Sequence, residues 1–185
     1  MQQAIHEIWG WVKSLSIAVI VVVILHSFIF SPTLVSGESM MPTLHDRDRM
    51  IISKIGELER FDIVVFHATE EKDYIKRIVG LPGDRIEYRN DVLYINGKAY
   101  DEPYLQPYKE QLNETTVEGP LTEDFTLIEK IGQDTVPDGM VFVMGDNRRN
   151  SIDSRHPSLG VVSMEEIIGK TNIIYWPIKD MQVIE

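Results

Sequence analysis

The sequence predicts an all-β domain that follows a single membrane-spanning helix, and three observations support this fold class. An almost wholly apolar run covers residues 15–30 of the 185-residue chain. Many short segments rich in β-branched residues follow it, with turn signals between them. The composition, 43% hydrophobic and 25% charged, is typical of a packed domain and not of a disordered chain. We therefore expect a membrane anchor over residues 1–32 and a folded domain over residues 33–185.

The apolar run is long enough for a transmembrane helix once the residues before it are included. With the hydrophobic residues between positions 8 and 12, it approaches the roughly 20 residues that a helix needs to cross a bilayer. Trp9 and Trp11 suit a membrane interface, Lys13 can extend its amine towards water, and Pro32 ends the span. The slight positive bias at the amino terminus predicts a cytoplasmic N-terminus and an extracytoplasmic domain.

Two other interpretations of this run are weaker. A buried core helix needs apolar partners, and no second segment of this kind occurs in the sequence. A cleaved signal peptide needs an Ala-x-Ala type of site after the run. The nearest small residues, at positions 35–37, would place the cut almost at Ser39. We therefore favour an uncleaved signal anchor.

The rest of the chain divides into short predicted strands bounded by turn signals. Gly80–Asp84 follows the third of them, and Asn96-Gly97 is a typical hairpin turn. Residues 101–124, rich in prolines and acids, predict an exposed irregular insertion or lid. A long polar loop is expected over 145–160 and a helical turn over 165–168. The predicted strands cover residues 50–53, 62–66, 74–79, 85–88, 92–95, 98–100, 125–131, 140–144 and 171–176.

Charge and cysteine content exclude several classes of function. The net charge is −11 and no run of lysines or arginines is present. A nucleic-acid partner is therefore not expected, because phosphate binding needs a basic surface. The chain contains no cysteine, which excludes disulfides, thiolate zinc sites and cysteine nucleophiles.

Ser39 is the first candidate for chemistry. It lies in the stretch 36–44, just outside the predicted span, between a glycine and a Met-Met-Pro segment. Serines in such loops are mostly turn residues, and a hydroxyl becomes a nucleophile only when a base takes its proton. A lysine can replace the histidine of a serine triad. His156 also remains open as a base, although nothing in the sequence identifies its partners.

Lys76 interrupts the apolar strand 74–79. Strand alternation places it on the same face as Tyr74 and Ile78. If that face is the inner one, desolvation lowers the pKa of the amine from about 10.4 towards the range of about 7–8 that suits a general base. A solvated lysine on an edge strand is the commoner situation, and the residue alone favours it.

The loop 144–155 combines two acids, three arginines, two asparagines and two serines. A solvated surface loop is one interpretation. The short polar residues alternate with charges of both signs, which suits a compact loop that satisfies its own backbone groups. Such a loop could hold a hydroxyl against Lys76.

Four segments occur in the order known from one family: Gly37–Leu44, Phe61–Phe66, Tyr74–Asp84 and Gly145–Arg155. Together with the anchor, they resemble the type I signal peptidases of bacteria, in particular the short single-anchor enzymes of Gram-positive bacteria. The resemblance covers nearly the whole chain. It implies an endopeptidase that removes signal peptides from exported preproteins, without cofactor or metal. It also implies a core of antiparallel β-sheets with a smaller inserted β region.

The resemblance assigns roles to individual residues. Ser39 matches the nucleophile, Lys76 the general base and Ser151 the residue whose hydroxyl orients that lysine. Gly37 stands where some relatives have a serine that donates to the oxyanion, so a second donor must come from elsewhere. The polar residues expected to hold the loop together are Asp146, Arg148, Asp153 and Arg155, with Arg77 as an ion-pair partner.

The implied substrates are signal peptides with small residues at positions −1 and −3, presented at a lipid bilayer. An extended peptide can pair with the strands that lead to Ser39 and Lys76. Shallow apolar pockets would receive its small side chains, and ordinary core packing is the alternative for each residue proposed to line them. By motif match, these residues are Val35, Met40, Leu44, Tyr74 and Ile75.

Two competing functions follow from the same sequence. One is a non-catalytic, membrane-tethered β domain that binds exported polypeptides. The other is a self-cleaving regulator with a similar Ser-Lys fold, which the anchor and the lack of a DNA-binding half argue against. The complete set of Ser39, Lys76, Ser151 and Asp153 favours the peptidase over the first alternative.

Overall fold

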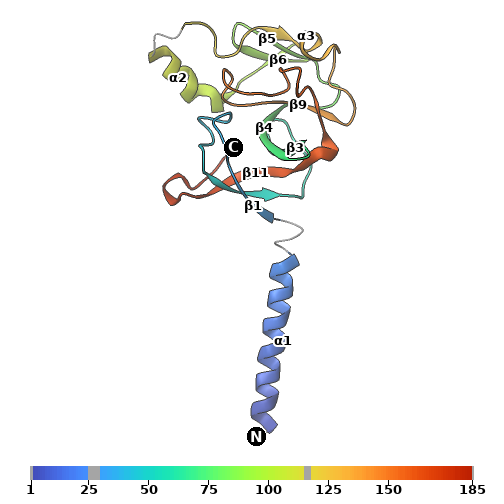
Figure 1. Ribbon diagram of the computed structural model, residues 1–185, viewed down its shortest axis with the longest axis vertical. Helices are drawn as coiled ribbons and strands as arrows, with labels where there is room; N and C mark the ends of the chain where they lie inside the picture. Colours follow the sequence, from blue (N-terminus) through green and yellow to red (C-terminus); the bar gives the residue numbers. More distant parts are fainter. Residues whose placement is uncertain (1, 25–29, 115–117, 185) are drawn as a thin grey trace.

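The computed structural model describes residues 2–24, 30–114 and 118–184. A long helix, α1 (Gln2–Ile24), projects away from a domain built mainly of β-strands (Figure 1). Within the described residues, no helix combines the length and the apolar character needed to cross a membrane. The predicted membrane-spanning helix is therefore not found in this part of the chain. Residues 25–29, at the end of the predicted span, lie outside the described residues.

The larger sheet contains eight strands, all paired antiparallel. Its order is β1-β2-β11-β3-β4-β9-β10, and β12 pairs with Ile173 and Ile174 of β11, beyond the residues of β11 that pair with β3. These strands are β1 (Phe30–Leu34), β2 (Arg49–Ser53), β3 (Ile63–Thr69), β4 (Lys72–Gly80), β9 (Met140–Met144), β10 (Val162–Ser163), β11 (Ile167–Trp176) and β12 (Gln182–Val183).

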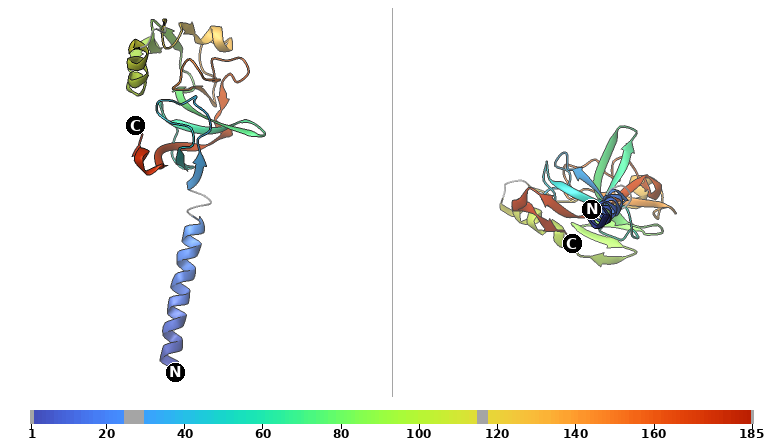
Figure 2. Two further views of the ribbon diagram at one scale, coloured as in Figure 1. Left: turned by 60° about the vertical axis from the view of Figure 1, so that its left-hand side comes forward. Right: turned by 90° about the horizontal axis from the view of Figure 1, so that it is seen from below.

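A smaller antiparallel sheet has the order β7-β6-β5-β8. It lies at the end of the domain far from α1, as Figures 1 and 2 show from different directions. Helices α2 and α3 belong to the same end of the molecule. The elements are β5 (Ile86–Arg89), β6 (Val92–Ile95), β7 (Lys98–Tyr100), α2 (Gln106–Glu114), β8 (Phe125–Thr126) and α3 (Leu127–Ile131).

The two central strands of the larger sheet, β3 and β4, lie in the core of the domain. The first four residues of β3, Ile-Val-Val-Phe, are all buried, and so are the last five residues of β4. Strands covered on both faces are continuously apolar instead of alternating. In β4, however, the buried stretch includes Lys76 and Arg77, so the core carries two cations that need partners.

The structure corrects three expectations about elements. Residues 125–131 are not one strand, because β8 ends at Thr126 and α3 follows, with a capping box between Thr126 and Glu129 and Gly132 in the left-handed region at its end. The segment 101–124 is not irregular throughout, since it contains α2 and a short 3-10 turn. Strand β1 was not expected, because Pro32 interrupts it; proline is tolerated here because β1 lies at the sheet edge.

Candidate active site

The loop between β1 and β2 presents Ser39. Gly37 adopts a φ of +94°, a conformation that suits glycine, and its N–H donates to Asp46 Oδ1 at 2.9 Å. Met40 and Leu44, on the far side of the serine, are almost completely buried. The loop is thus fixed on both sides of Ser39, whose side chain remains partly accessible.

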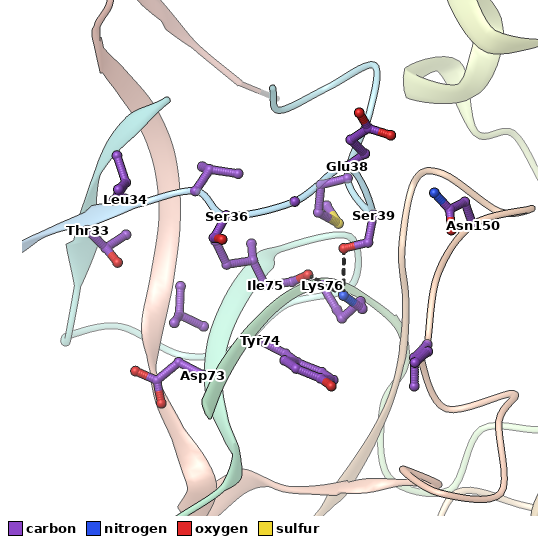
Figure 3. Close-up of a pocket in the computed structure, with 15 residues that line it drawn as sticks. Thr33, Leu34, Ser36, Glu38, Ser39, Asp73, Tyr74, Ile75, Lys76 and Asn150 are labelled. Carbon is purple, nitrogen blue, oxygen red and sulfur yellow. Dashed lines mark hydrogen bonds between the residues drawn. The ribbon is translucent and has the colours of Figure 1, made fainter. Parts of the chain in front are cut away.

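Lys76 of β4 meets Ser39 directly. Its Nζ lies 2.8 Å from Ser39 Oγ and 2.9 Å from the carbonyl oxygen of Ile75, and it donates a hydrogen bond to each (Figure 3). Lys76 is only 3% exposed, so it is not the solvated edge-strand lysine that the residue type alone favoured. Its strand lies between β3 and β9, in the middle of the sheet.

Burial lowers the pKa of Lys76 from 10.5 to about 8, while the negative charges of Asp153 and Asp146 act in the opposite direction. The ammonium form loses hydration in the core, which disfavours the charge. The two carboxylates limit this effect, because their negative charges attract the ammonium form. The amine is therefore neutral in a substantial fraction of molecules near pH 8.

The carboxylate of Asp146 is bound by residues from two segments, β4 and the Ser39 loop. Arg77 donates to both of its carboxylate oxygens, at 2.9 and 2.7 Å, and the Thr43 hydroxyl donates at 2.6 Å. Arg77 also donates to the carbonyl oxygen of Phe61 at 2.8 Å. These bonds attach the start of the polar loop to β4 and to the Ser39 loop.

Asp153 closes the same loop. It accepts hydrogen bonds from Arg155 Nε at 2.8 Å and Nη2 at 2.7 Å, and from the Gly145 N–H at 2.9 Å. Burial raises the pKa of Asp153, but the hydrogen bonds and charge of Arg155 outweigh it, so the pKa lies below its usual value. Asp153 therefore remains ionised near Lys76.

Ser151 does not make the contact with Lys76 that the resemblance implies. Its hydroxyl oxygen is buried and forms no hydrogen bond within the described residues, although it lies close enough to Asp153 to help lower that residue's pKa. The Ile75 carbonyl oxygen is the second partner of Lys76 instead. Ser151 does pack against Gly145, where an added Cβ would lie 2.3 Å from Ser151 Oγ and 2.4 Å from the Ser39 carbonyl oxygen.

Arg148 connects the polar loop to the smaller sheet. Its Nε donates to the Gly145 carbonyl oxygen at 3.0 Å, its Nη2 to Glu102 at 2.5 Å, and its Nη1 to the Tyr88 hydroxyl. Sequence reasoning missed Glu102 and Tyr88. Neither residue stands in a recognisable motif, and Glu102 lies in the segment 101–124 that was expected to be irregular.

A cleft of about 340 Å³ leads to Ser39 and Lys76. Four of the five proposed pocket residues line it: Val35, Met40, Tyr74 and Ile75. The fifth, Leu44, is fully buried in a core cluster and does not reach the cleft. The lining that the sequence did not suggest includes Glu38, Val65, Asp73, Asn150 and Ile152.

The alternative base, His156, lies away from this cleft. Its Nδ1 is 2.7 Å from Ser158 Oγ, and it lines a different cavity. None of the three histidines with described side chains lines the cleft at Ser39. The geometry therefore supports a Ser-Lys pair, in which a buried amine can take the proton of a hydroxyl.

Comparisons with known proteins find relatives that match most of the chain. The family model described as "Signal peptidase, peptidase S26" matches residues 8–176. Signal peptidase I of Bacillus caldolyticus is 51% identical over 92% of this chain and 91% of its own length. Signal peptidase I S of Bacillus subtilis (strain 168) is 45% identical over 95% of this chain and 93% of its own.

A solved structure is also similar. The crystal structure of a signal peptidase I from Enterococcus faecalis V583 is 41% identical, with a TM-score of 0.57, and the match covers 63% of this chain and 97% of that one. The shared fold is mostly antiparallel β-sheet. By family model, relatives and fold together, the chain belongs to the signal peptidase I family of peptidases, peptidase S26.

Proposed function

We propose that the chain is a membrane-attached serine endopeptidase that cleaves signal peptides from exported preproteins, with Ser39 as nucleophile and Lys76 as general base. The observation that carries this proposal is the distance of 2.8 Å between a buried Lys76 Nζ and Ser39 Oγ. A lysine in this environment has a pKa of about 8, which suits proton transfer near neutral pH.

In the first half of the reaction, neutral Lys76 takes the proton of Ser39 as Oγ bonds to the scissile carbonyl carbon. The carbonyl π electrons move to the oxygen, which becomes an oxyanion. When the oxyanion collapses, the C–N bond breaks and the Lys76 ammonium gives its proton to the leaving amine. The remaining hydrogen bond to the Ile75 carbonyl oxygen holds the amine in place. An ester between Ser39 and the signal peptide remains.

In the second half, Lys76 takes a proton from water, whose oxygen attacks the ester carbon. The new oxyanion collapses, the C–O bond to Ser39 breaks, and the proton returns to Oγ. Both oxyanions need hydrogen-bond donors. The Ser39 backbone N–H donates to no group within the described residues, and is therefore available, whereas Gly37 has no side chain to contribute.

The cleft suits an extended peptide with small apolar side chains. Residues 33–38 form one of its walls and residues 73–76 another. A peptide between them can pair with exposed backbone groups, and Val35 and Ile75 offer apolar surface to small residues at −1 and −3.

The signal peptidase I family is membrane-associated. We assign the attachment of this chain to its apolar run, residues 15–30, with the N-terminus cytoplasmic and the β domain on the extracytoplasmic side. Hydrophobic composition supports this assignment, since the run has almost no polar side chains. Attachment keeps Ser39 near the bilayer surface, where preprotein cleavage sites emerge.

The decisive test uses a preprotein with Ala at −1 and −3, incubated with the full chain and with the Ser39→Ala and Lys76→Ala variants. We expect cleavage by the native chain and none above background by either variant, with unchanged circular dichroism. Retained cleavage by a folded variant would contradict the Ser-Lys mechanism. A native chain that binds the preprotein without cutting it would support the non-catalytic alternative.

The pH dependence gives a second check. Because the base must be neutral, kcat/KM should rise about tenfold per pH unit below pH 8 and level off above the Lys76 pKa of about 8. A rate that is flat between pH 6 and 9 contradicts the assignment of Lys76 as base.

A further inference from the structure

Asn147 forms three hydrogen bonds that join the Ser39 loop to helix α2. Its backbone N–H donates to the Ser39 carbonyl oxygen at 3.0 Å, and its Nδ2 donates to the Glu38 carbonyl oxygen at 3.1 Å. Its Oδ1 accepts from the Tyr108 hydroxyl at 2.8 Å. Asn147 is only 8% exposed and does not line the cleft.

Two hydrogen bonds to the Glu38 carbonyl fix how the next N–H points. One comes from Asn147 Nδ2 and the other from the Met41 N–H at 3.1 Å. The peptide between Glu38 and Ser39 is planar and trans, so its carbonyl and its N–H point in opposite directions. The carbonyl points towards Asn147, so the Ser39 N–H points away from Asn147, in a residue that lines the cleft.

The Glu38 carbonyl fixes which way the Asn147 amide is turned. A carbonyl oxygen can only accept, so the NH₂ group must face Glu38, and this leaves the amide oxygen to accept from the Tyr108 hydroxyl. Reversing the amide would place its oxygen against the Glu38 carbonyl oxygen, and two acceptors repel. Tyr108 belongs to α2, within the segment 101–124 that the catalytic chemistry does not otherwise use.

We infer that Asn147 is a positioning residue for the oxyanion donor, and that Tyr108 keeps it in place. The inserted segment 101–124 thereby acts on the rate of acyl transfer without touching substrate. This inference rests on the proposed peptidase function. It assigns to Asn147 and Tyr108 an effect on the tetrahedral intermediate and not on peptide binding.

The expected effects differ between variants. Asn147→Asp keeps the shape but turns the donor into an acceptor, so we expect kcat to fall about 10²-fold, near the loss of one oxyanion donor. Tyr108→Phe removes one hydrogen bond and keeps the ring, so a fall of about 3- to 10-fold is expected. Tyr94→Phe, on β6, serves as the matched control, because no described residue bonds its hydroxyl, and its activity should not change.

The experiment separates positioning from general damage with two ligands of the full-length chain. One is a peptide aldehyde with Ala at its last and third-last positions, which forms a tetrahedral adduct with Ser39. The other is the corresponding peptide alcohol, which has no carbonyl carbon for Ser39 to attack and forms no tetrahedral adduct. We expect the aldehyde to bind each variant more weakly, in proportion to the loss of kcat/KM, while the affinity for the alcohol stays within about twofold. In Tyr108→Phe the acidic limb of the rate should stay near pH 8, since this change introduces no charge.

Two outcomes overturn the inference: native activity in Tyr108→Phe, or equal weakening of the aldehyde and the alcohol. If Asn147→Asp fails to fold in a thermal melt, Tyr108→Phe alone decides, because it leaves the loop intact. Failure of the peptidase function is recognised separately, since the native chain would then not cleave the preprotein at all.

Discussion

Lys76 is under two opposing electrostatic influences. Burial disfavours its charge, and the nearby carboxylates of Asp153 and Asp146 favour it, which together leave its pKa at about 8. Each carboxylate is itself paired with an arginine, Arg155 or Arg77. The positive charges of the arginines offset the negative charges of the acids and so reduce their pull on the amine. A lysine that had gained a full ion pair would have a raised pKa and would be a poor base at neutral pH.

The buried lysine should cost stability. Because its pKa is lower in the folded chain than the unfolded value of 10.5, the unfolded chain binds more protons between pH 8 and 10.5, and stability rises with pH in this window. We expect Lys76→Met, which removes the charge and nearly conserves volume, to be more stable than the native chain at pH 7. This advantage should shrink by about 2–3 kcal/mol on going to pH 10. Urea unfolding at pH 7, 8, 9 and 10 measures it, and a difference independent of pH would contradict the lowered pKa.

Sequence analysis brought Ser39 and Lys76 together through a family resemblance, and the structure places them in contact. It did not assign roles to Asn147 or Tyr108. Asn147 lies in the polar loop 144–155, but the sequence does not show which groups its amide bonds, and Tyr108 lies in a segment that was expected to be irregular. The prediction that Leu44 lines the cleft was wrong. Its position along the chain is near Ser39, but its side chain turns into the core.

At the scale of elements, the short strands of the larger sheet were predictable because their β-branched runs are bounded by clear turn signals. Residues 125–131 were misread, since a run of apolar residues this short fits a strand or a buried helix equally well. Thr126 and Glu129 have the spacing of a capping box, which was the available signal for α3. Helix α2 was not predicted, because Pro103 precedes it and Pro107 lies within it. The segment around it is also rich in acidic residues, a composition that suggested a loop.

Strand β4 is joined to the polar loop by the pair of Arg77 and Asp146, in which both side chains are almost fully buried. Arg77→Ala leaves Asp146 charged in the core, so we expect a loss of about 3–5 kcal/mol in the free energy of unfolding. Uncompensated, Asp146 also attracts the Lys76 ammonium more strongly, so the acidic limb of the rate should move above pH 8.

The matched control for this variant is Arg85→Ala. Arg85 and Asp134 form an ion pair in which both side chains are about 60% exposed, and exposed pairs contribute at most about 1 kcal/mol. Chemical denaturation of both variants, with a pH series on the folded protein, tests the comparison. Similar losses for Arg77→Ala and Arg85→Ala would mean that the buried pair is not what attaches the loop to β4.

At the scale of the whole molecule, the smaller sheet stabilises a loop that belongs to the larger one. Arg148 is almost fully buried and binds Glu102 and Tyr88 on one side and the Gly145 carbonyl oxygen on the other. Burial raises the pKa of Glu102, but the charge and hydrogen bonds of Arg148 outweigh it, so Glu102 stays ionised. The two sheets therefore share one polar network around Gly145, where an added Cβ would collide with both Ser39 and Ser151.

This network predicts that the smaller sheet and the active site lose stability and activity together. Arg148→Lys keeps the charge but cannot reproduce the fork that bonds Glu102, Tyr88 and the backbone at once. We expect Arg148→Lys and Glu102→Gln each to lower stability by about 2–4 kcal/mol and to reduce kcat on a soluble peptide.

In a double-mutant cycle the second change should cost less than the first, with a coupling of about 1–3 kcal/mol, because both remove the same contact. Thermal melts should keep a single transition. Two separate transitions, or full activity in a destabilised variant, would show that the smaller sheet folds beside the active site without supporting it.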